Sequence, residues 1–230
     1  INRFVDEINE IGNGFNVNKD FVLKACLVLS DFNDITFKVD NFNKSNMLKI
    51  EDSWDDITKA IRDAVRLISS FGFSRENITS NNLIIPIAYY LKHIGLPDNF
   101  EVSMARISDR SKIKKWFTLS LLKRVFSFMP DGVLKPVREI IKNDSRGEFP
   151  IESIINRFKG TNRTLVFTKE DISNLLCTKY GNGDTLVILS ILYPWADLRN
   201  NFHIDHIFPK SLFTRKRLER KGIKGVEINK

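Results

Sequence analysis

The chain has 230 residues, of which 42% are hydrophobic, and a formal net charge of +8 at pH 7. The apolar fraction is too high for a disordered tail, and the length suits one large domain or two small ones. The longest apolar run, residues 185–195, is too short and too interrupted to cross a bilayer, so we expect no membrane segment. The surplus of positive charge favours polyanionic partners.

The first hundred residues predict helices separated by polar connections. Residues 18–32 place apolar side chains at helical spacing after Asn18, which is a suitable N-cap. Residues 81–97 are apolar almost all round and predict a buried helix that tolerates Pro86 in its first turn and ends near His93. We expect the polar residues 33–50 to be mostly loop.

Residues 53–73 predict a further helix with signals at both ends. Ser53 followed by Asp56 resembles a capping box, and Gly72 is a natural C-terminal stop. Helical spacing returns in the second half of the chain, over residues 111–128, 131–144, 150–158 and 168–180. The last of these helices opens with another capping-box pair, Thr168 and Asp171.

The expected fold is mainly α. The polar stretch 141–150 predicts a division into a multi-helix domain, residues 1–145, and a second region, residues 146–230. Cys26 and Cys177 both lie in apolar helical patterns, so we expect two buried thiols, no disulfide and a cytoplasmic protein. The start at Ile1, without a charged and apolar leader, predicts a piece of a longer protein.

The positive charge is concentrated in two parts of the chain. Residues 106–148 carry eleven Lys and Arg against five Asp and Glu, and residues 203–230 carry eight against three. The basic run 210–225 has a weak apolar side and predicts a short helix. It is either a solvated charged face or a surface that follows a phosphate backbone.

The stretch FHIDHIFP, residues 202–209, contains two of the three histidines. Its alternation of apolar and polar residues predicts a strand ended by Pro209, with His203 and Asp205 on one face. A carboxylate beside an imidazole suits phosphodiester hydrolysis. A hard divalent cation prefers carboxylate oxygen, and a neutral imidazole can take a proton from the attacking water near physiological pH.

The residues HIDHIFPKSLF, 203–213, resemble the first half of the HNH, or ββα-metal, nuclease motif. The helical part that precedes them resembles the rear part of the GmrSD-type modification-dependent restriction enzymes, which join a ParB-like nucleotide-hydrolysing domain to an HNH nuclease domain. This resemblance implies the start of a ββα-metal domain within residues 146–230. It also implies a DNA endonuclease that acts in defence against modified foreign DNA.

The resemblance implies roles for individual residues. Asp205 would bind Mg²⁺ or Mn²⁺ and His206 would be the general base, while Pro209 and Ser211 would shape the turn. His203 would lie behind the metal ligand or contact a phosphate. The ParB-like domain would precede Ile1 and the asparagine-bearing half of the motif would follow Lys230, so we expect the fragment alone to be inactive. Nucleic-acid contacts would come from His203, Lys210, Arg215, Lys216, Arg217, Arg220 and Lys221.

Three alternatives stay open for this stretch. His203 and His206 could hold a structural zinc ion, or could be two histidines without a chemical role. The whole chain could also be a helical module that binds nucleic acid or another partner without cleaving it.

Overall fold

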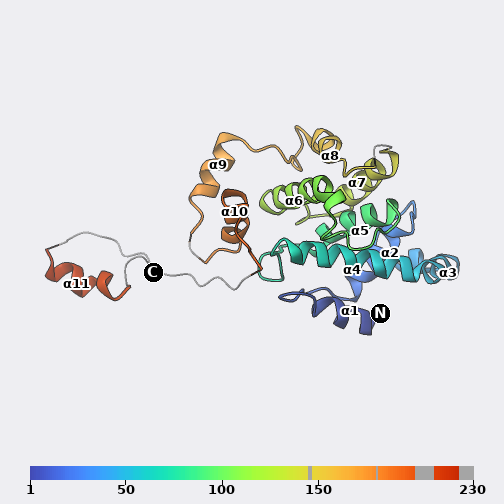
Figure 1. Ribbon diagram of the computed structural model, residues 1–230, viewed down its shortest axis with the longest axis horizontal. Helices are drawn as coiled ribbons and strands as arrows, with labels where there is room; N and C mark the ends of the chain where they lie inside the picture. Colours follow the sequence, from blue (N-terminus) through green and yellow to red (C-terminus); the bar gives the residue numbers. More distant parts are fainter. Residues whose placement is uncertain (145–146, 180, 200–209, 223–230) are drawn as a thin grey trace. The chain divides into compact units, whose positions relative to one another are not determined.

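The computed structural model describes residues 1–144, 147–179, 181–199 and 210–222 (Figure 1). The chain divides into two compact units, Ile1–Arg199 and Asn200–Lys230. The helices of the first unit are α1 Asn2–Asn9, α2 Lys19–Leu29, α3 Lys44–Asp52, α4 Trp54–Ser70, α5 Ile84–His93, α6 Ile107–Leu122, α7 Asp131–Asn143, α8 Ile151–Phe158, α9 Lys169–Leu176 and α10 Asp184–Leu192. Three short 3₁₀ turns accompany them, η1 Val39–Phe42, η2 Asn81–Leu83 and η3 Met104–Arg106. The second unit contains η4 Lys210–Phe213 and α11 Arg215–Arg220.

Helix α5 is the centre of the first unit and packs against α4, α2 and α7. Every residue from Ile84 to Leu91 is buried, as the apolar sequence predicts. Pro86 is the third residue of the helix, where a missing N–H leaves no intrahelical hydrogen bond unmade. Figure 1 shows α5 between α4 and α7, so neighbouring helices cover it on opposite sides.

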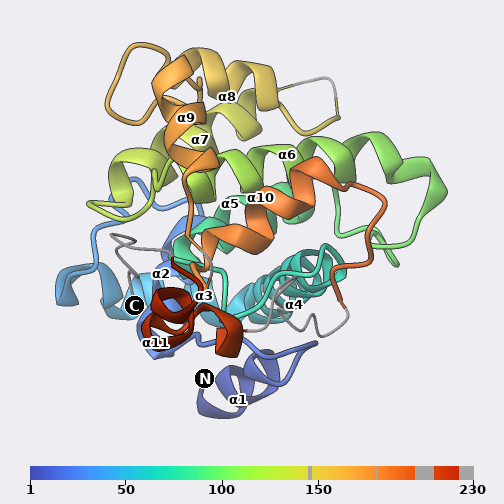
Figure 2. The same cartoon turned by 90° about the vertical axis from the view of Figure 1, so that its left-hand side faces the viewer.

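An aromatic cluster joins later parts of the chain to this centre. The ring of Phe149 lies 5.2 Å from that of Tyr90 on α5 and 5.5 Å from that of Trp116 on α6. These three side chains are almost completely buried. Helix α8 follows Phe149 and packs on α6 and α7, while α10 lies beside α6 in Figures 1 and 2. The division expected at residue 145 stays a prediction about domain organisation.

The predicted end signals are confirmed in part. The side chain of Asn18 accepts a hydrogen bond from Phe21 N at 2.9 Å, and Thr168 forms a reciprocal capping box with Asp171. The capping box expected at Ser53 is wrong, because its side chain forms no capping hydrogen bond. Ser53 also ends α3, and its near-helical ψ of 9° differs from the extended backbone of an ordinary N-cap.

Three further expectations need correction. Residues 33–50 are not mostly loop, since they contain η1 and most of α3, whose N-cap Asn43 accepts a hydrogen bond from Asn46 N. Helix α6 begins four residues earlier than expected and ends at Leu122. Cys177, the C-cap of α9, is exposed like the helix before it, which has no buried residue, whereas Cys26 is buried as predicted.

The regular elements of the described residues are all helical, which confirms a mainly α fold for that part of the chain. The strand expected within residues 202–209 lies outside the described residues, and no part of a ββα unit is seen within the described ones. None of the described helices combines the length and the apolarity that a membrane crossing requires.

Candidate functional site

The predicted catalytic residues His203, Asp205 and His206 lie outside the described residues. His93 is the one histidine that the structure describes; it is exposed at the end of α5, and its ring stacks on that of Tyr89 at 6.4 Å. Within the described ranges, no group of three or more His, Cys, Asp or Glu side chains is arranged to hold a metal ion. The proposed metal site therefore depends on the residue types of the HIDH stretch alone.

Five of the predicted nucleic-acid contact residues have described side chains, and all five lie on α11 or at its C-terminal end. Lys210 is the first residue of η4, and its side chain lies outside the described set. The other five cations, Arg215, Lys216, Arg217, Arg220 and Lys221, are all exposed, and Lys221 is the C-cap of the helix. The short helix expected in this basic run is thereby confirmed.

Helix geometry separates these five cations into two groups. At about 100° per residue, Lys216, Arg217, Arg220 and Lys221 share one face of the helix. Leu218 lies on the other side and is buried, so this apolar contact turns the four cations outward. Arg215 lies away from the face, and its Nε donates to Glu219 Oε1 at 2.9 Å. We call Lys216, Arg217, Arg220 and Lys221 the α11 cationic face.

The charge of this face is available to a ligand. None of its four side chains forms an ion pair with another described residue. Arg217 and Arg220 lie in the last turn, where the helix dipole favours positive charge. Ammonium and guanidinium groups in such an array bind phosphates and fix the register of a protein on nucleic acid without reading its sequence.

A polar network at the C-terminal end of α2 does not follow from the sequence pattern. The helix ends in a Schellman motif, in which Asp31 N donates to Val28 O and Phe32 N donates to Leu27 O. Asp31 takes the left-handed position with φ of 58°, where glycine is usual. Its carboxylate accepts a hydrogen bond from the Tyr89 hydroxyl at 2.8 Å. Burial, together with this bond, raises the pKa of Tyr89.

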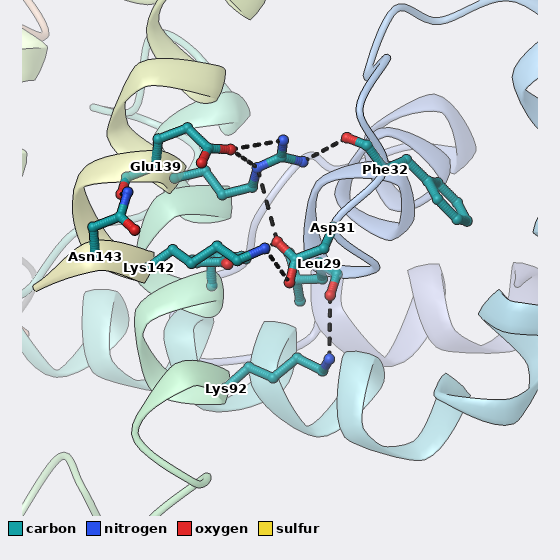
Figure 3. A network of polar contacts seen from close by, with 9 residues as sticks. Leu29, Asp31, Phe32, Lys92, Glu139, Lys142 and Asn143 are labelled. Carbon is teal, nitrogen blue, oxygen red and sulfur yellow. Dashed lines mark hydrogen bonds and ion pairs between the residues drawn. The ribbon is translucent and has the colours of Figure 1, made fainter.

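Arg138 on α7 completes the network around Asp31. Its side chain is only 3% exposed, and its guanidinium donates to Phe32 O at 2.8 Å and to the Glu139 carboxylate at 3.0 Å. Figure 3 shows Lys142 and Glu139 reaching toward the end of α2 from one side and Lys92 from another. Three cations thus approach the negative end of the α2 dipole, which gives the network a structural role.

A second polar feature is a pocket of about 510 Å³ beside the start of α2. Lys24, which is 7% exposed, donates to Ile35 O at 2.5 Å and forms an ion pair with Asp131 at the start of α7. The exposed ring of Phe37 and the side chain of Asn82 form part of the wall. Because Lys24 binds a backbone carbonyl and a carboxylate of its own chain, its role in the structure is to join α2, residue 35 and α7.

A scan against protein-family models finds no match for this chain, and a comparison with curated proteins finds no significant relative. The functional argument therefore depends on the chain's own residues.

Proposed function

We propose that this chain is part of a metal-dependent DNA endonuclease, with an HNH-type active site that begins in the HIDH stretch. The observation that carries the proposal is the residue string HIDHIFPKS, 203–211, in which a carboxylate and an imidazole are adjacent and a basic run follows directly. The α11 cationic face supports it, because a nuclease that contains this string needs phosphate contacts close by in the chain.

The proposed division of labour follows from the chemistry of the side chains. Asp205 would hold Mg²⁺ or Mn²⁺, because these hard cations prefer carboxylate oxygen. The ion would supply charge neutralisation at the phosphate that is cleaved. His206 in its neutral form would accept the proton of the attacking water. His203 is proposed as a phosphate contact or as a group behind the metal ligand, since in the strand that the sequence predicts it would share a face with Asp205 rather than with His206.

The proposed biological setting is restriction of modified foreign DNA in the cytoplasm. The resemblance to GmrSD-type enzymes supports it and adds a ParB-like nucleotide-hydrolysing domain to the intact protein. The rest of the metal site would come from an asparagine-bearing segment of the same protein.

Substitution of the two proposed catalytic residues tests the enzyme. In the intact protein, Asp205→Ala and His206→Ala should each abolish Mg²⁺- or Mn²⁺-dependent nicking of plasmid DNA while gel-shift binding is retained. Cleavage by the double variant at the wild-type rate would show that these residues are not the active site. Stoichiometric zinc in the purified protein, with loss of stability on chelation, would instead favour the structural zinc site.

Helix α11 offers a matched test of DNA retention. Replacing the four residues of the cationic face by alanine should weaken DNA binding and flatten its dependence on salt, by about 0.9 in the log–log slope for each phosphate that the protein no longer neutralises. Single variants give the matched comparison: Arg217→Ala and Arg215→Ala each remove one exposed cation, but Arg215 pairs with Glu219 and Arg217 forms no ion pair with another described residue. An equal loss of DNA affinity in these two single variants would mean that total charge, and not this face, binds DNA.

The alternative is a helical module that binds nucleic acid without cleaving it. The exposed cationic face favours this function as much as it favours a nuclease. Salt-dependent binding by the intact protein, without metal-dependent cleavage under any condition and unchanged by Asp205→Ala, would establish the alternative.

A further inference from the structure

The pocket beside the start of α2 is built where three helices begin. Its lining residues come from α2 and its N-cap, from residues 36–37, from η2 directly before α5 and from the start of α7. All of them belong to the unit Ile1–Arg199. Its volume of about 510 Å³ lies in the range of about 300–1,000 Å³ in which proteins bind small molecules. We call this cavity the α2 pocket.

An exposed aromatic ring in the wall of the α2 pocket is held by local contacts. Phe37 is 46% exposed, and its ring meets the ring of Phe42 edge to face at 5.6 Å. The chain beside it is fixed, because Asp34 accepts a hydrogen bond from Thr36 N at 2.8 Å and Asn41 Nδ2 donates to Thr36 O at 2.6 Å. The ring is therefore in place before a ligand arrives. Nucleobases stack on aromatic side chains of this kind.

Asn82 brings an unused amide to the same pocket. Two other asparagines in the wall are already engaged. Asn18 Oδ1 accepts a hydrogen bond from Phe21 N at 2.9 Å. Asn81 Nδ2 donates to Asn16 O at 2.6 Å. The side chain of Asn82 is partly buried and forms no hydrogen bond with another described residue, so its donor and its acceptor are both open to a ligand.

The charges around the α2 pocket favour an uncharged ligand. Asp20 and Asp131 lie in the first turns of α2 and α7, where their carboxylates offset the positive ends of the helix dipoles. Lys24 is 7% exposed, and its ammonium group is bound to Ile35 O and paired with Asp131. A phosphate in the pocket would face two carboxylates, and a cation would face the buried ammonium group. Neither charge is therefore favoured over a neutral molecule.

Adenine fits both the aromatic ring and the amide. One edge of this base carries an amino donor, N6, beside an acceptor, N7, and the amide of an asparagine pairs with the two at once. Guanine carries two acceptors, O6 and N7, on the same edge, so an asparagine cannot form this pair with it. The flat face of adenine matches the aromatic wall that Phe37 provides.

We propose that the α2 pocket binds an adenine ring carried by an uncharged molecule, such as its nucleoside, with the ring stacked on Phe37 and hydrogen-bonded to Asn82. The inference goes beyond the proposed nuclease function, because every residue of the site belongs to the helical unit and the binding needs neither DNA nor a metal ion. The carboxylates of Asp20 and Asp131 make it a site for the nucleoside and not for the nucleotide.

Titration of the ¹⁵N-labelled full chain with adenosine, guanosine and AMP tests the site, with NMR chemical shifts as the readout. Adenosine should shift the side-chain amide of Asn82 and the backbone amide of Phe37. Guanosine should bind about fivefold more weakly, because it cannot form the paired hydrogen bonds. AMP should also bind more weakly than adenosine, because its phosphate meets the carboxylates.

Substitutions separate the two contacts. Asn82→Ala should weaken adenosine binding about fivefold and remove the preference over guanosine. Phe37→Ala should weaken it at least about fivefold, whereas Phe37→Tyr keeps an aromatic face and should bind like the wild type. Asn174→Ala is the control for Asn82→Ala. Asn174 is exposed on α9, and its side chain likewise forms no hydrogen bond with another described residue.

Four results would overturn the inference: no adenosine-induced shift at Asn82 or Phe37, equal affinities for adenosine and AMP, equal affinities for adenosine and guanosine, or wild-type affinity in both Asn82→Ala and Phe37→Ala. Circular dichroism spectra of the variants separate lost binding from unfolding. Both side chains are at least partly exposed, so the spectra should match the wild type. The outcome does not depend on whether the HIDH stretch cleaves DNA.

Discussion

Arg138 provides the sharpest test of how the helical unit is stabilised. Replacing it by alanine leaves Phe32 O without its hydrogen bond and removes a buried guanidinium from two carboxylates, Glu139 and Asp31. Hydrogen bonds to charged groups contribute about 1.5–3 kcal/mol, and loss of a fully buried ion pair costs about 3–5 kcal/mol. Because both carboxylates are nearly half exposed and can be solvated, we expect the lower part of this range, about 3 kcal/mol.

Lys142 is the control for this change, since it belongs to the same network (Figure 3). It lies 3.5 Å from Asp31, but its side chain is 48% exposed, so Lys142→Ala should cost less than about 1 kcal/mol. Urea unfolding followed by circular dichroism measures both values, and thermal unfolding should show a fall of about 6–12 °C for Arg138→Ala. Equal destabilisation by the two changes would refute the assignment of stability to the buried guanidinium.

Two further predictions concern thiols and acid. Burial raises the pKa of Cys26 to about 12, so a thiol reagent should label one cysteine in the native protein, two in urea and none in native Cys177→Ser. A hydrogen bond from the Thr168 backbone, with Lys123 nearby, lowers the pKa of Asp171 to about 2. The stabilisation of α9 by ionised Asp171 is complete above the ordinary carboxyl pKa of about 4 and is lost as the pH falls toward 2. The amide NMR shifts of α9 should therefore change between about pH 4 and pH 2. The Asp171→Asn variant should show no such change.

Helices with strong apolar periodicity can be predicted from the sequence, and their ends only in part. Helix α3 is not predicted by this pattern. Ile50 is its one buried residue, so the asparagine-rich stretch has no apolar side chains repeating at helical spacing. Asn43, which caps it, is a usable local signal. The apolar neighbours of Cys177 predict a core position, but α9 buries none of its residues.

Long-range contacts limit what the sequence predicts at helix ends. Gly72 is recognisable from the sequence as a helix stop. The sequence does not show that a side chain at this position would collide with Leu198, which lies far along the chain. Asp31 gives no stop signal, because the left-handed position at a Schellman end usually belongs to glycine. The carboxylate of Asp31 accepts a hydrogen bond from Tyr89 and forms ion pairs with Arg138 and Lys142. These tertiary contacts, and not the helix end alone, explain why an aspartate occupies this position.

Tertiary contacts also decide which of the positively charged side chains are available to a ligand. Residues 106–148 carry more Lys and Arg than residues 203–230, eleven against eight. Seven of the eleven bind carboxylates or backbone carbonyls of the protein: Arg106, Arg110, Lys112, Lys123, Arg124, Arg138 and Lys142. A cation already paired in this way must lose its partner before it contacts a phosphate, which reduces the gain from binding.

The α11 cationic face has no such competition among the described residues. It belongs to the unit that begins at Asn200, and its first residue, Lys216, comes ten residues after His206 in sequence. If the net charge of +8 were spread evenly over the protein surface, any part of the surface could bind a polyanion. Unpaired charge concentrated on one short helix predicts instead that DNA affinity and its salt dependence follow α11, and that neutralising Lys112 or Lys123 on the helical unit changes stability more than binding.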